Sequence, residues 1–213
     1  MEVQQVKLII SSENTTLTKD LKDFLSPKFN LKTFYMDYIP GHGESKNELM
    51  KTKSDLSSIN SVVKEPSKIL YARSYSAFDK KGWDTIKSSF KNNEVYISTE
   101  SIINQLHKQN AKNIFLISPY NQYRHDYEIK WLRNFGFKVI GSVALGRTGG
   151  PAIASTPRDM ILNSNKVAQM SDADCIYIAC TILPTLPIIN ELKGEIPVIT
   201  AASAMLSEAG IID

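Results

Sequence analysis

The sequence predicts an α/β protein built from two similar lobes, and two observations lead to this prediction. Short apolar runs alternate with helix-like segments throughout the 213 residues, which is the pattern of parallel sheets with helices on both faces. The order strand, helix, strand, helix, strand then occurs a second time, which indicates an internal repeat. We therefore expect two four-stranded parallel sheets in two lobes that face each other.

Eight apolar runs bounded by polar or turn-forming residues are the predicted strands. They are Val6–Ile10, Lys32–Met36, Lys68–Ala72, Glu94–Ile97, Asn113–Ile117, Phe137–Gly141, Cys175–Ala179 and Pro197–Thr200. The repeat aligns Leu8–Ser11 with Phe115–Ser118, and Tyr71–Ser74 with Ile178–Thr181, both at an offset of 107 residues. Few residues are identical, but the two halves follow the same strand plan.

Three of the helix-like segments carry start or stop signals. Thr15–Leu25 follows Asn14, a candidate N-cap. A capping box opens the segment from Ser45 to about Lys64. Tyr123–Asn134 ends just before a glycine, which is a common C-terminal stop.

The overall composition argues against several classes of function. The net charge is only +3, with no basic run, so nothing favours nucleic acid or a membrane surface as a partner. No apolar stretch approaches the ~20 residues of a membrane span, and the N-terminus has no charged-then-apolar signal. We expect a cytoplasmic protein whose apolar helix faces leave room for a homodimer.

The two cysteines are expected to stay reduced. Cys175 and Cys180 lie on one predicted strand and point to opposite faces. At ~3.3 Å per residue they are about 17 Å apart, too far for a disulfide, which fits a reducing compartment. Cys175, in mid-strand, is expected to be an ordinary core residue. No His, Cys or acidic cluster has metal-ligand spacing, so we expect no metal.

Three loops after predicted strands combine small hydroxyl and amide side chains with a helix start. They are Ser11–Thr16, Ser118–Gln122 and Cys180–Pro184. Free backbone N–H groups at such helix starts can hold an anion such as a carboxylate. A fourth loop, Gly146–Pro151, is rich in glycine but lacks the Lys-Ser/Thr ending of a phosphate loop, so we expect no nucleotide there.

Cys180 is the residue most expected to be reactive. It follows an apolar strand and precedes a polar turn and a new helix, where α/β enzymes place reactive groups. The repeat puts Arg73 at the matching point of the other lobe. We therefore expect the thiol and the guanidinium to face one shared cleft.

The loops resemble those of the aspartate/glutamate racemase superfamily. Ser11–Thr16, Ser118–Tyr120 ahead of Gly136–Ile140, and Ala179–Pro184 occur in the order found there, and the resemblance is closest to the maleate isomerase and arylmalonate decarboxylase branch. The resemblance implies a cofactor-independent enzyme that acts at the carbon next to a carboxylate. It also implies two pseudo-symmetric flavodoxin-like lobes with an interlobe active site.

The resemblance further implies how the chain divides into lobes. A C-terminal helix, here at about 202–212, completes the first lobe in this superfamily. We therefore expect residues 1–97 and about 202–213 in the first lobe and residues 98–201 in the second.

The same resemblance implies roles for single residues. Cys180 matches the catalytic cysteine of the second lobe, and Tyr120 and Asn14 match substrate-contacting residues. Two positions depart from the pattern, because the first-lobe cysteine position falls on Arg73 and a loop asparagine position falls on Gly150. The decarboxylase branch also lacks the first cysteine and has a glycine there.

A single thiol limits the reactions that such a site allows. Arg73, with a pKa above ~12, is neither a base near neutrality nor a nucleophile, whereas decarboxylation needs an anion-stabilising site and one proton from one face. We expect Cys180 to donate that proton, Ser74 to be a catalytic hydrogen-bond donor to the anion, and Arg73 to hold a carboxylate through paired hydrogen bonds. The other residues expected to bind this small carboxylate substrate are Ser12, Asn14, Ser76, Tyr120 and Thr181.

Two other functions stay open at this point. A maleate isomerase-like or racemase-like enzyme would use Ser74 in place of the first cysteine. A non-catalytic carboxylate-binding protein would keep the cleft without the chemistry.

Several candidates also have plain structural explanations. Asn14 can serve only as an N-cap, and Arg73 can form an ion pair with Glu13. Ser74 and Ser76 can satisfy local backbone groups. The histidines are expected to be solvated, His42 in a surface loop and His107 and His125 on helices.

Overall fold

The computed structural model describes residues 3–25, 27–37, 46–63, 65–74 and 77–212, with only the backbone given for 46–51. The chain divides into two compact units. The first unit comprises Met1–Glu13, Leu25–Ser101 and Met205–Asp213, and the second comprises Asn14–Phe24 and Ile102–Ala204. Each unit is therefore assembled from segments that are distant in the sequence. The lobe boundaries expected from the sequence, at 97 and about 202, stay a prediction.

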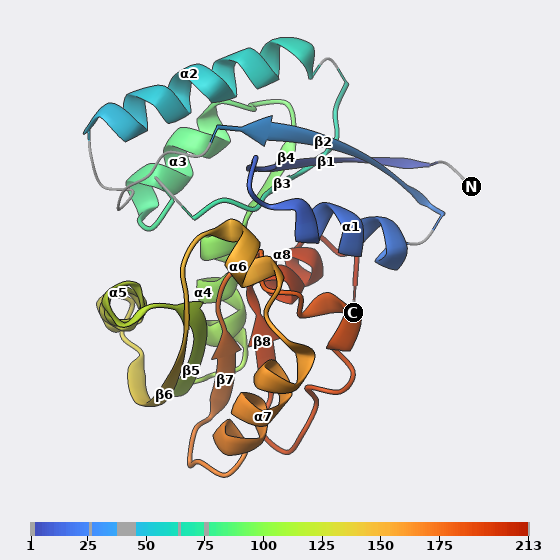
Figure 1. The fold of residues 1–213 in the computed structure, drawn as a ribbon. Coiled ribbons are helices and arrows are strands. Elements are labelled where there is room, and N and C mark those ends of the chain that lie inside the picture. Colours follow the sequence, from blue (N-terminus) through green and yellow to red (C-terminus); the bar gives the residue numbers. More distant parts are fainter. Residues whose placement is uncertain (1–2, 26, 38–45, 64, 75–76, 213) are drawn as a thin grey trace. The chain divides into compact units, whose positions relative to one another are not determined.

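The first unit contains a four-stranded parallel sheet with the strand order β2-β1-β3-β4. Its strands are β1 (Gln4–Ser11), β2 (Phe29–Met36), β3 (Lys68–Tyr71) and β4 (Glu94–Ile97). The helices α2 (Lys46–Val62) and α3 (Lys80–Ser88) lie together on one side of this sheet (Figure 1). The central strands β1 and β3 are apolar and buried, as expected for parallel strands covered by helices.

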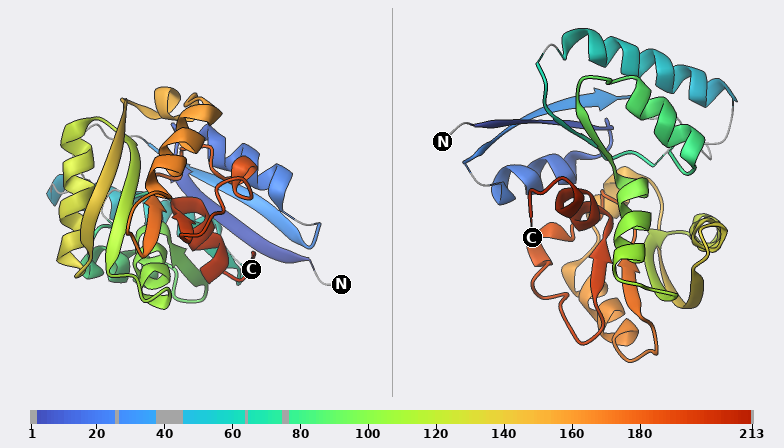
Figure 2. Two further views of the ribbon diagram at one scale, coloured as in Figure 1. Left: turned by 90° about the horizontal axis from the view of Figure 1, so that it is seen from below. Right: turned by 180° about the vertical axis from the view of Figure 1, so that it is seen from behind.

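The second unit repeats the same plan with the order β6-β5-β7-β8, again all parallel. Its strands are β5 (Asn113–Tyr120), β6 (Lys138–Arg147), β7 (Cys175–Ile178) and β8 (Val198–Thr200). In this order β6 lies on one side of β5 and β7 lies on the other, so the connections β5–β6 and β6–β7 run in opposite directions across the sheet. Right-handed crossovers therefore place α5 (Gln122–Asn134) and α7 (Arg158–Ala168) on opposite faces, as Figures 1 and 2 show. The α/β class, the parallel sheets and the repeat are thus confirmed.

Five further helical segments complete the part of the chain that the structure describes. They are α1 (Thr15–Phe24), α4 (Ser98–Lys108), α6 (Gly150–Ala154), the short 3₁₀ helix η1 (Leu186–Ile188) and α8 (Ala201–Glu208). The helix α1 connects β1 to β2 but packs in the second unit, against η1. No described helix is long and apolar enough to cross a membrane.

The hydrogen bonds between strands refine the repeat. The Ala72 N–H donates to the Ile9 carbonyl at 2.9 Å, and the Ala179 N–H donates to the Ile117 carbonyl at 2.8 Å. Ile9 therefore corresponds to Ile117, one residue beyond the offset of 107 predicted for these strands, whereas the two alanines keep that offset. The residues that follow the alanines occupy equivalent positions in their own sheets, as predicted for Arg73 and Cys180.

A compact apolar core supports the carboxyl end of β7. Ile117, Ile178 and Leu183 pack there with Ile161 of α7, and all four are at most 1% exposed. Each such side chain contributes about 1.5–3 kcal/mol by leaving water. Cys180 packs against this cluster, so the loop that carries it rests on a rigid base.

Candidate active site

Cys180 has an unusual backbone. It follows β7 with φ = +80°, in the left-handed region that favours glycine. A non-glycine residue held there costs about 1–3 kcal/mol and is found where the surrounding structure fixes it, often at functional sites. The fixing contacts are the Ala179 N–H bond to Ile117 and a 3.3 Å bond from the Leu183 N–H to the Cys180 carbonyl.

Three donors surround the Cys180 sulfur. The Tyr120 hydroxyl and the backbone N–H groups of Ile182 and Leu183 donate hydrogen bonds to Sγ. Burial raises the pKa of the Cys180 thiol, and the three donors lower it by less than burial raises it. Cys180 is therefore a thiol near neutral pH, which is the form that can give up a proton.

Tyr120 is held in place beside the thiol by an arginine. The Arg124 guanidinium carbon lies 5.6 Å from the centroid of the Tyr120 ring and 4.8 Å from that of Tyr127, within the range of a cation–π contact. Burial, followed by the nearby Cys180, raises the pKa of Tyr120 well above its ordinary value. Tyr120 thus remains a phenol and a hydrogen-bond donor.

Asn14 joins the start of α1 to the Cys180 loop. Its Oδ1 accepts a bond of 3.1 Å from the Leu17 N–H, and its Nδ2 donates to Thr181 Oγ1 at 3.2 Å. The predicted N-cap is confirmed, and Asn14 is only 1% exposed. One buried amide therefore caps a helix and fixes the residue next to the thiol.

Arg73 and Ser74 follow β3 in the first unit. Arg73 is buried, and its Nη1 lies 3.8 Å from the sulfur of Met36 at the end of β2. Ser74 is half-buried, and its carbonyl accepts a bond from the Ala77 N–H at 3.0 Å. A guanidinium and a hydroxyl group are thus carried by consecutive residues just beyond the carboxyl end of β3.

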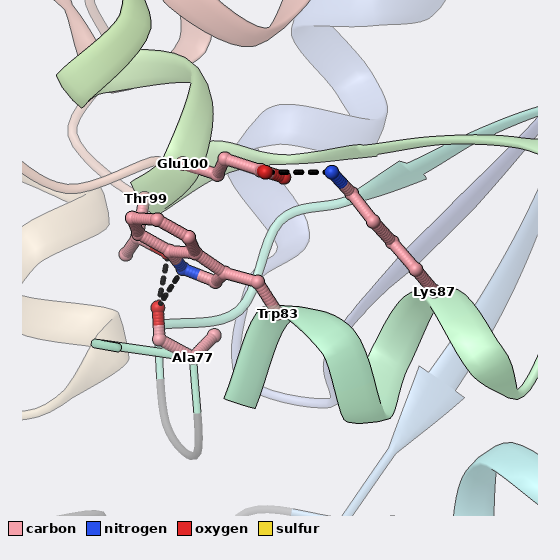
Figure 3. Close-up of polar contacts among 5 residues, drawn as sticks. All are labelled: Ala77, Trp83, Lys87, Thr99 and Glu100. Carbon is pink, nitrogen blue, oxygen red and sulfur yellow. Dashed lines mark hydrogen bonds and ion pairs between the residues drawn. The ribbon is translucent and has the colours of Figure 1, made fainter. Parts of the chain in front are cut away.

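Polar contacts anchor Ala77 and the neighbouring helices of the first unit (Figure 3). The Trp83 Nε1–H of α3 donates to the Ala77 carbonyl at 2.7 Å and contacts Thr99 Oγ1 at 3.1 Å, and the Thr99 hydroxyl also donates to Ala77. Lys87 forms a 2.6 Å ion pair with Glu100. These bonds tie Ala77, which lies between β3 and α3, to α3 and to the first turn of α4.

The candidate residues therefore fall into two groups. Asn14, Tyr120, Cys180 and Thr181 come together in the second unit, while Arg73 and Ser74 lie in the first. Their meeting in one cleft stays a prediction. Two expected residues contribute less: Ser12 is exposed with its N–H bonded to the Met36 carbonyl at 2.9 Å, and Ser76, like His42, lies outside the described residues.

One expectation is wrong, and two buried neighbours were missed. His125, expected to be solvated, is 2% exposed, and its Nδ1 lies 2.7 Å from Ser118 Oγ. Burial lowers the pKa of His125. Glu128 and Tyr177 are also buried, joined by a 3.1 Å hydrogen bond. The missed signal is helical spacing, since His125, Glu128 and the buried Leu132 recur at i, i+3 and i+7 on α5.

The other cysteine and histidine behave as expected. Cys175 is fully buried, and both cysteines are free thiols. Burial raises the pKa of Cys175 to about 12, so it is an inert core residue. His107 is exposed, with its ring centroid 4.8 Å from that of Phe137. No cluster of three His, Cys, Asp or Glu side chains in the described ranges has the geometry to hold a metal ion.

The sequence matches no protein-family model and no curated protein, but the fold is shared by solved structures. The maleate isomerase Iso from Pseudomonas putida S16 is 17% identical, with a TM-score of 0.79 over 99% of this chain and 94% of that one. The maleate cis-trans isomerase of Nocardia farcinica is 17% identical, with a TM-score of 0.77 over 98% and 93%. Unliganded arylmalonate decarboxylase is 14% identical, with a TM-score of 0.72 over 97% and 91%. The fold implied by the resemblance is therefore confirmed along the whole chain.

Proposed function

We propose that this protein is a cofactor-independent enzyme that acts at the carbon next to a carboxylate of a small dicarboxylic acid. Its reaction is a decarboxylation, as in arylmalonate decarboxylase, with Cys180 as the single proton donor. The observation that carries this proposal is the Cys180 thiol itself. It sits in a constrained turn at the carboxyl end of β7, accepts bonds from Tyr120 and two backbone N–H groups, and keeps its proton because its partly buried position raises the pKa of the thiol.

The proposed reaction balances with one proton. The bond between the α-carbon and one carboxylate breaks, carbon dioxide leaves, and the electron pair stays on the substrate as an enediolate. The enediolate oxygens are those of the remaining carboxylate, which Arg73 holds through paired hydrogen bonds and which hydroxyl donors such as Thr181 and Ser74 stabilise as charge develops. The Cys180 S–H proton then moves to the α-carbon, and the resulting thiolate regains a proton from solvent.

A second reaction, isomerisation, is favoured by the fold comparison. Two maleate isomerase structures superpose with TM-scores of 0.79 and 0.77, while further structures of the isomerases and of the decarboxylase both reach 0.75. One mutant of the Nocardia farcinica enzyme carries a covalently bound succinylcysteine intermediate. Covalent addition requires a thiolate nucleophile. Because burial keeps Cys180 protonated, we place isomerisation, with Ser74 in the role of the missing cysteine, behind decarboxylation.

Turnover of candidate acids by the intact protein tests the proposal. We expect activity on a malonate among malonates, maleate, aspartate, glutamate and hydantoins. Cys180→Ser should lower kcat by roughly a hundredfold or more because a hydroxyl is a far weaker acid than a thiol, whereas Cys175→Ser should leave it nearly unchanged. Carboxylate binding without any turnover would instead identify a binding protein.

Heavy water separates the two enzymatic candidates. A decarboxylase introduces one deuterium into its product only as carbon dioxide leaves. A racemase exchanges the α-hydrogen of its substrate, and an isomerase releases no carbon dioxide at all. Mass spectrometry of substrate and product distinguishes these outcomes.

We also propose that the protein works in the cytoplasm. Its two cysteines are unpaired, and free thiols persist in a reducing compartment.

A further inference from the structure

The end of β5 is irregular just before Tyr120, the residue that contacts the thiol. Between Ser118 and Tyr120, β5 advances by two residues while its partner β6 advances by three, from Ala144 to Arg147, so the regular pairing is broken. Pro119, which lies between them, has no N–H to donate to a neighbouring strand. The strand pairing alone therefore does not fix the direction of the Tyr120 side chain.

A buried hydrogen bond to α5 supports this irregular strand end. Ser118 Oγ lies 2.7 Å from His125 Nδ1, and the two residues are 0% and 2% exposed. A hydrogen bond shielded from water in this way is costly to break, because each partner would be left buried and unpaired. His125 is itself anchored in the first turn of α5, where its N–H donates to the Asn121 carbonyl at 2.9 Å.

The preceding residue of α5 contacts the Tyr120 ring. The guanidinium carbon of Arg124 lies 5.6 Å from the centroid of that ring, and the Arg124 N–H donates to Oδ1 of Asn121, the N-cap of α5, at 3.1 Å. Ser118 and Tyr120 are two residues apart on one strand, so their side chains lie on the same face of the sheet. Two consecutive residues of the helix therefore contact two alternate residues of the strand, and the second of these donates to the Cys180 sulfur.

We propose that His125 is a positioning residue, which through its hydrogen bond to Ser118 fixes the end of β5 so that the Tyr120 hydroxyl points at the Cys180 sulfur. This role rests on the proposed function, in which Cys180 gives up its proton and becomes a thiolate. A donor directed at the sulfur stabilises that thiolate. The bond between Ser118 and His125 thus supports the proton transfer without any contact with the substrate.

The pH dependence of Cys180 alkylation measures this positioning without any need for turnover. Iodoacetamide reacts with the thiolate, and mass spectrometry of the Cys180 peptide gives the rate at each pH. Ser118→Ala and His125→Leu each remove the buried hydrogen bond. We expect the midpoint to move to higher pH, because the thiolate loses part of the Tyr120 hydrogen bond, and alkylation below the midpoint should be roughly threefold slower. Burial lowers the pKa of His125, so the ring is neutral where the thiol titrates and its replacement removes no charge.

Two further measurements make the test specific. If Ser118 and His125 act through the Tyr120 hydroxyl, Ser118→Ala should shift the midpoint of the wild type but not that of Tyr120→Phe. Ser164→Ala is the matched control, since it removes another buried hydroxyl of the second unit, which donates to the Met160 carbonyl at 2.9 Å within α7. Its midpoint should equal that of the wild type.

An unchanged or lower midpoint in either folded variant, Ser118→Ala or His125→Leu, overturns the role of His125. Ser118→Ala alone decides the question if His125→Leu does not fold. An equal rise in the Tyr120→Phe background, or in Ser164→Ala, overturns the role as well, because the effect would then not pass through the Tyr120 hydroxyl. The expected shifts in a protein that turns over no carboxylate would support the positioning role and reject the proposed function, so the two failures are distinguishable.

Discussion

At the scale of single residues, the backbone of Cys180 makes a prediction about stability. Its φ of +80° suits glycine, so Cys180→Gly should be more stable than Cys180→Ala by about 1 kcal/mol. At Cys175, within β7, the order should be reversed, because glycine weakens an extended strand. Urea unfolding of the four variants measures both differences. Equal stability of the Cys180 pair would show that the turn is not strained.

The residues around Cys180 also show what the sequence can and cannot reveal. The thiol could be found because a polar turn follows an apolar strand, and Asn14 because it precedes a helical pattern. Glu128 and His125 could not be placed by their neighbours in the chain, since Arg124 and Asp126 suggest a solvated helix. Their burial depends on which face of α5 packs against the sheet. In the sequence, only their i, i+3, i+7 spacing with the apolar Leu132 indicates that face.

At the scale of elements, the contribution of the hydrogen bonds among Trp83 of α3, Thr99 of α4 and Ala77 to stability can be measured. Trp83→Phe keeps an aromatic ring but removes both Nε1 hydrogen bonds, while Thr99 still satisfies the Ala77 carbonyl. We expect the free energy of unfolding to fall by about 1–2 kcal/mol. Because Ala77 follows Arg73 and Ser74 in the chain, the KM for the carboxylate substrate should also rise.

The exposed ion pair between Lys87 of α3 and Glu100 of α4 provides the control for Trp83→Phe. Lys87→Met removes an ion pair whose lysine side chain is 44% exposed, and such pairs contribute less than about 1 kcal/mol. Its unfolding free energy and KM should stay close to those of the wild type. If Trp83→Phe behaves like Lys87→Met, the indole N–H does not anchor Ala77.

At the scale of the whole molecule, the proposed function requires the Arg73 and Cys180 positions to share one cleft. Arg73→Cys creates a second thiol, and a short bis-maleimide should then join it to Cys180 within one chain. The double variant with Cys180→Ser should give no such product. Peptide mass spectrometry detects the crosslink. If both thiols react with the reagent and no crosslink forms, positions 73 and 180 do not share a cleft, and Arg73 and Ser74 are not part of the site.

The fold was more predictable than the site at this scale. Each of the eight described strands overlaps one of the predicted apolar runs. Burial in a parallel sheet leaves such runs, bounded by turn residues, as a strong local pattern. The longer course of β6, to Arg147 instead of Gly141, was missed since its residues are only partly buried and carry no continuous apolar run. Contacts between distant segments, such as Asn14 with Thr181, leave no mark in either local sequence.

The division of the chain has a consequence for how the protein forms on the ribosome. The second unit draws on Asn14–Phe24, and the first unit draws on Met205–Asp213. Lys68 of the first unit donates a 2.5 Å hydrogen bond to the Ala209 carbonyl, and that residue is synthesised after all four strands of the second unit. The first unit therefore cannot be completed until the ribosome has translated the second unit. Nascent chains that stop within the second unit should remain sensitive to protease.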